Sequence, residues 1–337
     1  MRNVSVLGST AIALALAATV TTPALAQDFN MKIAHVVPKG DPRDTAARHV
    51  ADLMNESDSC SMSAEVFPSA QLGSTTDLIE GMQFGSIEAV VLPASFLVGF
   101  QPMMGVFDLP YFWPSDVDAL TRLHNGDAVR KLLDSTDAQG VYSMAAWHTG
   151  NKQWTGNKPL VDPKDYQGLN SRVMPSAVLV AQQSALGLNP VDMPFPETYS
   201  ALQSGAIDAQ ENPVPTSYFM KFNEVQSHMT MTNHGNLDQI FMVSKSWWEG
   251  LTPECQTALD AAVTSGQEVV ISETQRIEKL AMEAFKEQGM TIVTPTDEQR
   301  ATLRDGALPA ARAKFIEQTG EAGEAMLKEL EAAMENL

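Results

Sequence analysis

One arginine stands out among the residues whose type and position could do chemistry. Arg172 lies in the run GLNSRVMPS, residues 168–176, near the end of an expected strand over 169–174 and directly before an expected helix over 176–185. Strand ends of this kind are where α/β sheets bind their ligands. A guanidinium there can hold a planar carboxylate through two parallel, charge-assisted hydrogen bonds. The alternative for a lone arginine is a salt bridge on the surface.

Catalytic motifs are missing from the sequence. The six histidines include no pair at the i, i+4 spacing of a zinc-protease helix. No G-x-S-x-G nucleophile elbow, no phosphate-binding G-x-x-x-x-G-K and no dinucleotide-binding G-x-G-x-x-G occurs. The 18 methionines are more typical of core filling than of a copper site. We therefore expect no enzyme, no cofactor and no metal, with a hydrolase that uses an unmarked carboxylate pair as the alternative.

The composition describes an acidic protein with ample apolar material. The chain has 337 residues, 44% of them hydrophobic, with 22 Lys and Arg against 41 Asp and Glu, a net charge of −19. That length predicts about two domains. A charge of this sign repels phosphate backbones, so we expect no nucleic-acid partner. Two cysteines are too few for a disulfide-rich scaffold or a four-cysteine zinc site.

The first 26 residues have the pattern of a cleaved signal peptide. Arg2 precedes an apolar stretch that includes residues 11–18, and the run ends in Pro-Ala-Leu-Ala before Gln27. Threonines and a proline interrupt the stretch, whereas a membrane anchor needs about 20 consecutive apolar residues. We therefore expect export to the periplasm. Export permits a disulfide between Cys60 and Cys255. Their spacing alone, however, is equally compatible with two separate buried thiols.

The expected elements alternate in type along the chain. Strands over 31–37, 62–67 and 87–92 are separated by a helix that starts at Asp41-Pro42 and another that starts at Ser74 and ends at Gly85. Such a series predicts a mostly parallel sheet with helices on both faces, and a second series begins near Gly150. A helix from Thr252-Pro253 to about 288 would be about 54 Å long, enough to cross two lobes. We find no linker, so crossover strands are expected to form the hinge.

Several blocks resemble the substrate-binding proteins of TRAP (tripartite ATP-independent periplasmic) transporters, of the dicarboxylate-binding type. Besides residues 168–176 they are VFPSAQLG (66–73), FDLPYF (107–112), ETYSALQSG (197–205), DAQENP (208–213), KFNEVQ (221–226) and TMTNH (230–234). They occur in the family's order across essentially the whole chain after residue 26.

The resemblance implies a fold and a function. The fold is a two-lobed α/β clamp with two mostly parallel sheets, crossover hinge strands and a long helix that spans both lobes. Lobe 1 is expected over 27–150 plus about 237–275, and lobe 2 over 151–236 plus about 276–337. The implied function is to bind a small organic carboxylate, a C4-dicarboxylate or sugar acid first and a keto or hydroxy acid next, and to deliver it to a membrane permease. A receptor that feeds a sensor kinase and a secreted hydrolase or lyase are the alternatives.

Matching residues give the expected site. Arg172 matches the family's carboxylate-binding arginine, and Asn212 matches its contact asparagine, with a turn residue before Pro213 as the alternative for Asn212. Lys152 stands where many relatives carry an arginine; it keeps the charge but loses the planar fork, so only a point contact is expected. Phe195 matches the aromatic residue that lines the pocket.

Three further side chains are candidates because of their position at expected strand ends. Trp147 could stack on an apolar face of the ligand or pack in a core. His35 and Gln239 lie near strand ends that should face the cleft. The family's topology also places Cys60 and Cys255 together in lobe 1, which favours a disulfide between them.

Overall fold

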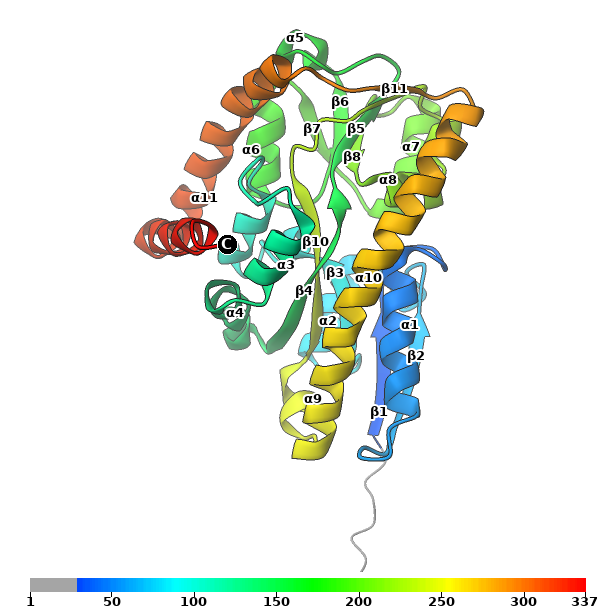
Figure 1. Cartoon of the computed structure of the whole chain (residues 1–337), viewed down its shortest axis with the longest axis vertical. Coiled ribbons are helices and arrows are strands. Elements are labelled where there is room, and N and C mark those ends of the chain that lie inside the picture. The colour runs from blue at the N-terminus through cyan, green and yellow to red at the C-terminus, as the bar shows by residue number, and fades with distance from the viewer. Residues whose placement is uncertain (1–28) are drawn as a thin grey trace, which may run out of the picture.

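A computed structural model describes residues 29–337, and the predicted signal peptide over 1–26 lies outside the described residues. The described chain forms two lobes, each with its own sheet, as predicted (Figure 1). In this part of the chain we find no helix that is long and apolar enough to cross a membrane.

Lobe 1 is built around a five-stranded sheet. Its strands are β1 (Phe29–Ala34), β2 (Met62–Phe67), β3 (Ala89–Pro93), β4 (Val141–Asn151) and β10 (Asn236–Ser244), in the order β2-β1-β3-β10-β4. Its helices are α1 (Pro42–Asn55), α2 (Thr75–Gln83), α3 (Val117–His124), α4 (Asp127–Asp134) and α9 (Lys245–Glu249), with 3-10 turns η1 (Ala94–Phe96), η2 (Pro102–Asp108) and η3 (Asp137–Gln139). The predicted caps are present: Asp41 caps α1, and Ser74 forms a capping box with Asp77.

Lobe 2 is built around a smaller, four-stranded sheet. Its strands are β5 (Gln153–Gly156), β8 (Gln210–Asn212), β9 (His228–Thr230) and β11 (Thr291–Val293), in the order β11-β9-β5-β8, and β6 (Asn170–Val173) pairs separately with β7 (Asn189–Asp192). Its helices are α5 (Pro163–Tyr166), α6 (Ala177–Ala185), α7 (Thr198–Ser204), α8 (Val214–Phe219) and α11 (Asp297–Met334), with 3-10 turns η4 (Phe195–Glu197) and η5 (Phe222–Glu224).

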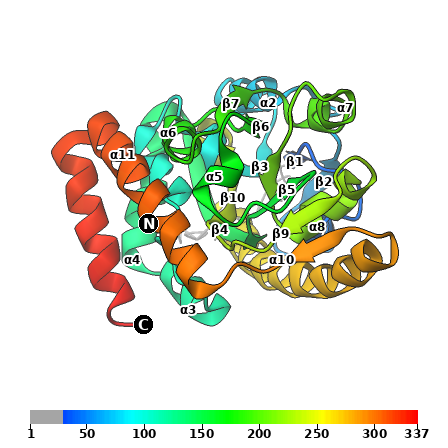
Figure 2. The same cartoon turned by 90° about the horizontal axis from the view of Figure 1, so that it is seen from above.

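The last helix, α11, packs on both lobes. It packs on α6 of lobe 2 and on α4 and η2 of lobe 1. Gly320 breaks its regular backbone with a positive φ of 60°, and Figure 2 shows the chain turning sharply there, so that the final part folds back beside the first. The C-terminal residues that the sequence assigns to lobe 2 therefore also cover lobe 1.

The sheets are mostly parallel in strand direction, as expected, but each contains one strand that runs against the others. β1 pairs in parallel with β2 and β3, but β10 runs antiparallel to β3 and β4, and β5 runs antiparallel to β8 and β9. The reason is the double connection between the lobes. β4 leads the chain out of lobe 1 into β5, and β10 brings it back, so these neighbouring strands must run in opposite directions. Alternating strands and helices predict parallel strand directions only within one uninterrupted strand–helix series, and not across the connection between the lobes.

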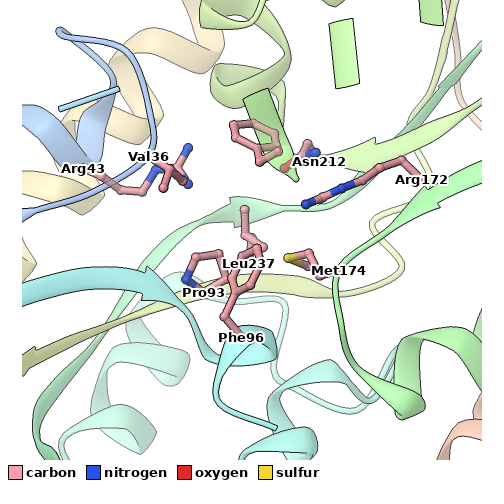
Figure 3. Close-up of a pocket in the computed structure, with 9 residues that line it drawn as sticks. Val36, Arg43, Pro93, Phe96, Arg172, Met174, Asn212 and Leu237 are labelled. Carbon is pink, nitrogen blue, oxygen red and sulfur yellow. The ribbon is translucent and has the colours of Figure 1, made fainter. Parts of the chain in front are cut away.

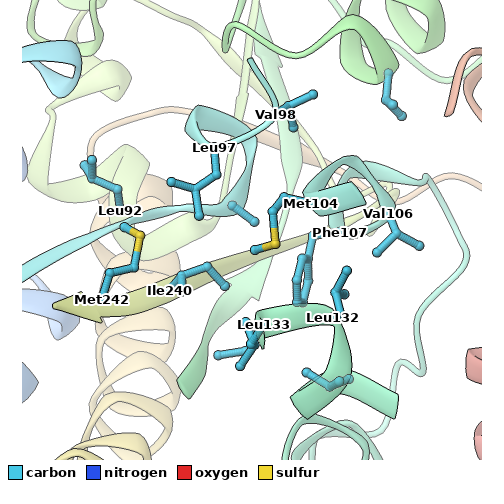
Figure 4. Close-up of a cluster of buried hydrophobic side chains, with 14 of the residues drawn as sticks. Leu92, Leu97, Val98, Met104, Val106, Phe107, Leu132, Leu133, Ile240 and Met242 are labelled. Atoms are coloured by element: carbon cyan, nitrogen blue, oxygen red, sulfur yellow. The ribbon is translucent and has the colours of Figure 1, made fainter. Parts of the chain in front are cut away.

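β10 lies between β3 and β4 in the sheet of lobe 1 and is buried on both faces. Ile240 and Met242 point into one core, where they meet Leu92, Met104 and Leu132 (Figure 4). Phe241 and Val243 point the other way, into the core under α1 and the long helix α10 (Pro253–Glu287). Successive side chains of a strand face opposite sides, so one continuous apolar run supplies both cores.

The long helix α10 spans both lobes as predicted. It packs on α1 and β4 of lobe 1 and on α8 of lobe 2. Its only glycine, Gly266, lets it approach the core closely, since a Cβ there would lie 2.6 Å from the ring of Trp147. The predicted disulfide is confirmed: Cys60 and Cys255 are bridged, with Cα atoms 4.8 Å apart, which ties the first turn of α10 to the segment between α1 and β2.

Candidate ligand-binding site

A small cavity lies between the lobes and collects residues from both. The space between its side chains, open solvent included, is about 250 Å³. The lining residues are Val36, Arg43, Pro93, Phe96, Arg172, Met174, Phe195, Asn212 and Leu237 (Figure 3). Three of these side chains are polar and the rest are apolar.

Arg172 of β6 presents a buried charge to this cavity. The side chain is 2% exposed, and its only hydrogen bonds within residues 29–337 are long ones, from Nε and Nη2 to the carbonyl oxygen of Met193 at 3.4 and 3.5 Å. No carboxylate of residues 29–337 lies within ion-pair distance of it. Burial lowers its pKa to about 10, so the guanidinium stays charged at neutral pH. An unpaired buried charge is costly, so the site favours an anion.

Phe195 and Asn212 flank this guanidinium. The carbon at the centre of the Arg172 guanidinium lies 5.4 Å from the centre of the Phe195 ring, a cation–π arrangement. Asn212 is the last residue of β8, and its side-chain nitrogen donates to Gln210 Oε1 at 2.6 Å, which orients the amide. Figure 3 shows Asn212 and Arg172 side by side at the cavity. The structure thus brings together three of the predicted site residues.

Lys152 lies outside the cavity lining and has another buried partner. Its Nζ donates to Glu211 Oε1 at 3.1 Å, and His234 Nε2 lies 2.5 Å from Glu211 Oε2. Burial raises the pKa of Glu211, but Lys152 and His234 outweigh it and hold that pKa at about 2. Glu211 precedes Asn212 on β8, so the two side chains point to opposite sides of the strand. The charge of Lys152 is therefore compensated on the side of β8 away from Asn212.

The three candidates chosen from strand ends also lie outside the lining. Trp147 is fully buried in lobe 1, where its Nε1 donates to the carbonyl oxygen of Val263 on α10 at 3.2 Å. The side-chain nitrogen of Gln239 donates to Thr149 Oγ1 at 3.2 Å, and His35 Nε2 lies 3.3 Å from Asp44 Oδ1. The core-packing alternative thus describes Trp147, whereas ligand contact by His35 and Gln239 stays a prediction.

The sequence interpretation missed Arg43, although a signal was present. Arg43 lines the cavity from the first turn of α1. The amino end of a helix carries a partial positive charge, so a cation in the first turn is disfavoured unless it has another use. Glu211 and His234 were also missed as the partners of Lys152, since 59 and 82 positions separate them from it in the chain and nothing local pairs them.

Comparisons with known proteins point in one direction. A family model described as bacterial extracellular solute-binding protein, family 7, matches residues 33–318. The C4-dicarboxylate-binding periplasmic protein DctP of Rhodobacter capsulatus is 34% identical over 310 residues, covering 90% of this chain and 91% of the relative. Among solved structures, a TRAP periplasmic solute binding protein from Desulfovibrio salexigens with bound orotic acid has a TM-score of 0.89 at 32% identity, covering 91% of this chain and 99% of that one. One from Shewanella oneidensis with bound succinate has a TM-score of 0.85 at 30% identity, covering 91% and 100%.

Proposed function

Because the chain belongs to family 7 of the bacterial extracellular solute-binding proteins, we propose that it is a periplasmic receptor that binds a small organic carboxylate and delivers it to a TRAP-type membrane permease. Membership confirms the resemblance found in the sequence. The family consists of solute-binding proteins, which agrees with the lack of catalytic motifs.

The observation that carries this proposal is the buried, unpaired guanidinium of Arg172. A carboxylate in the cavity would accept two parallel hydrogen bonds from its fork and would neutralise its charge. Asn212 lies beside it and would supply a neutral hydrogen bond, and Phe195 holds the other face of the guanidinium. The mostly apolar lining favours a compact acid over a large sugar.

Delivery to a permease is supported by the arrangement of the lobes and by the relatives. The lobes are joined by β4, β10 and α10, which together can act as a hinge around the cavity. Relatives are named periplasmic binding proteins, and the solved neighbours with bound succinate and orotic acid are described as TRAP solute binding proteins. The signal-peptide pattern over 1–26 agrees with the same compartment.

A thermal-shift screen over organic acids tests the proposal. A ligand at about 1,000 times its dissociation constant adds roughly 4.1 kcal/mol of stability, which gives a clear rise in melting temperature. We expect one or more short-chain acids to give this rise and to be recovered unchanged after incubation. A rise with neutral sugars alone would contradict the carboxylate assignment, and turnover of the bound acid would favour the hydrolase or lyase alternative.

A further inference from the structure

A hydrogen bond joins the two lobes at the edge of the cavity. Arg43 Nη2, from the first turn of α1 in lobe 1, donates to Thr216 Oγ1 of α8 in lobe 2 at 2.9 Å. Both residues are buried, with Arg43 3% exposed and Thr216 2% exposed. Arg43 lines the cavity, whereas Thr216 does not. The bond therefore connects the lobes beside the site, and one of its two partners can be changed without altering the lining.

Asp41 holds the guanidinium of Arg43 in position for this bond. Nε and Nη2 of Arg43 donate to the two carboxylate oxygens of Asp41 at 2.8 and 2.9 Å. Both residues belong to lobe 1 and are two positions apart, so their pairing does not depend on whether the lobes are together. The bond to Thr216 forms only where the lobes meet. Because the guanidinium is already oriented and its charge is balanced, a neutral hydroxyl on the opposite lobe can bind it with little loss of side-chain entropy.

The same face of α8 also packs on lobe 1. Thr216 and Phe219 are three positions apart, which places them on one face of the helix. A Cβ at Gly40 would lie 3.4 Å from Phe219 Cε1, so the segment before α1 is in close contact with this ring. α8 begins directly after Asn212 and Pro213, and Asn212 lines the cavity. The helix that receives the hydrogen bond from lobe 1 is thus the one that follows a residue of the site.

We propose that the hydrogen bond between Arg43 and Thr216 is a closing latch, which forms when the lobes close over a ligand and slows the release of that ligand. The inference rests on the proposed function, because it needs a ligand that binds between the lobes. A contact that favours the closed arrangement raises the affinity for every ligand of that arrangement by the same factor. The release rate should change more than the association rate, since the latch forms after the first encounter.

Thr216→Val tests the latch, because it removes the hydroxyl and keeps nearly the same shape. Succinate, malate, orotate and gluconate serve as probes, and the tightest binder of the four is followed by calorimetric titration and by stopped-flow release. We expect Thr216→Val to weaken its affinity by at least about tenfold, the loss for a hydrogen bond to a charged group. The association rate should stay within about twofold, so that the loss lies in the release rate. A second acid of the panel that binds should lose affinity by the same factor.

Thr216→Ser restores a hydroxyl and should bring the affinity back to within about threefold of the wild type. Ser217→Ala is the matched control, because Ser217 follows Thr216 on α8 and its buried hydroxyl has no hydrogen-bond partner among residues 29–337. This control should leave the affinity and the release rate unchanged. Unchanged release from Thr216→Val, or a loss that Thr216→Ser does not restore, would overturn the latch. The proposed function fails in a different way, through a wild type that binds none of the four acids, and the latch then fails with it.

Discussion

Lys152 Nζ donates to Glu211 Oε1 at 3.1 Å, and both side chains are almost fully buried at the start of lobe 2. This pair gives Lys152 a buried counter-charge within the protein. Because Glu211 also contacts His234, its carboxylate has a partner on each oxygen. The pair is therefore expected to stabilise the junction of β5 and β8 rather than to hold the ligand directly.

Glu211→Gln should lower the free energy of unfolding by about 3–5 kcal/mol, because it removes the carboxylate that is hydrogen-bonded to the buried ammonium of Lys152. Urea unfolding measures the change. Lys152→Met/Glu211→Leu should recover much of the loss, since an apolar pair of similar size carries no buried charge. The control is Glu317→Gln, which breaks an exposed pair with Lys314 and should cost less than about 1 kcal/mol. A similar small effect for Glu211→Gln would show that the buried pair contributes little.

Asp108 should make stability fall between about pH 4 and pH 6. Burial raises its pKa from 3.8 to about 6, although Lys152 opposes the shift, and Ser95 Oγ donates to its Oδ1 at 2.5 Å. The folded protein holds this proton more tightly than the unfolded chain. The stabilisation is thus present below the unfolded pKa and is lost as pH rises through the folded pKa, with a slope of at most about 1.4 kcal/mol per pH unit.

The difference in unfolding free energy between wild type and Asp108→Asn isolates this contribution. Urea unfolding at several pH values from 4 to 7 should show the wild type losing stability relative to the variant as pH rises. Parallel pH profiles for the two proteins would mean that Asp108 does not titrate in this range.

The disulfide should protect both cysteines from labelling. Thiol labelling of denatured, unreduced protein is expected to find no free cysteine, because Cys60 and Cys255 are bridged and are the only two in the chain. Cys60→Ala/Cys255→Ala should lower the free energy of unfolding by about 2–5 kcal/mol, since the bridge closes a long loop in the unfolded chain. Two labelled thiols per molecule would refute the bridge.

Replacing Gly266 with alanine, which adds the smallest side chain, should destabilise the protein. A Cβ at this position would lie 2.6 Å from the ring of Trp147 and 2.9 Å from Val50, so Gly266→Ala should destabilise the protein by about 1–3 kcal/mol despite the higher helix propensity of alanine. Gly306→Ala on α11 is the matched control, because its nearest neighbour, Leu186, would be at 3.5 Å. We expect that variant to be neutral or more stable in thermal unfolding. The same gain at Gly266 would mean that α10 is not packed closely on Trp147.

Local features of the fold could be predicted from the sequence. The caps at Asp41, Ser74 and Thr252 start helices where expected, because capping depends on residues only three or four positions apart. Strand directions could not be predicted across the hinge. They depend on how β4 and β10 leave and re-enter lobe 1, which no local pattern records.

Residues of the cavity lining were predicted from the sequence only where they match residues of the family. Arg172 and Asn212 come from blocks shared with the family, Phe195 matches the family's pocket aromatic, and the three meet at one cavity. Strand periodicity alone did not settle which way Trp147 faces, because β4 is buried on both sides and its alternation is weak. Arg43 was missed because its use depends on the approach of the opposite lobe.

Calorimetric titration of Arg172 variants with the best acid from the screen tests the central claim most directly. Arg172→Ala should lose about 2–5 kcal/mol of binding free energy, roughly 30-fold to several thousand-fold in affinity, and Arg172→Lys should also bind poorly because it lacks the planar fork. Asn212→Ala should fall between these and the wild type, since a neutral hydrogen bond contributes about 0.5–1.5 kcal/mol. Arg48→Ala, outside the cavity lining, should leave the affinity unchanged. A folded Arg172→Ala protein that binds within about threefold of the wild type would contradict the carboxylate site at Arg172.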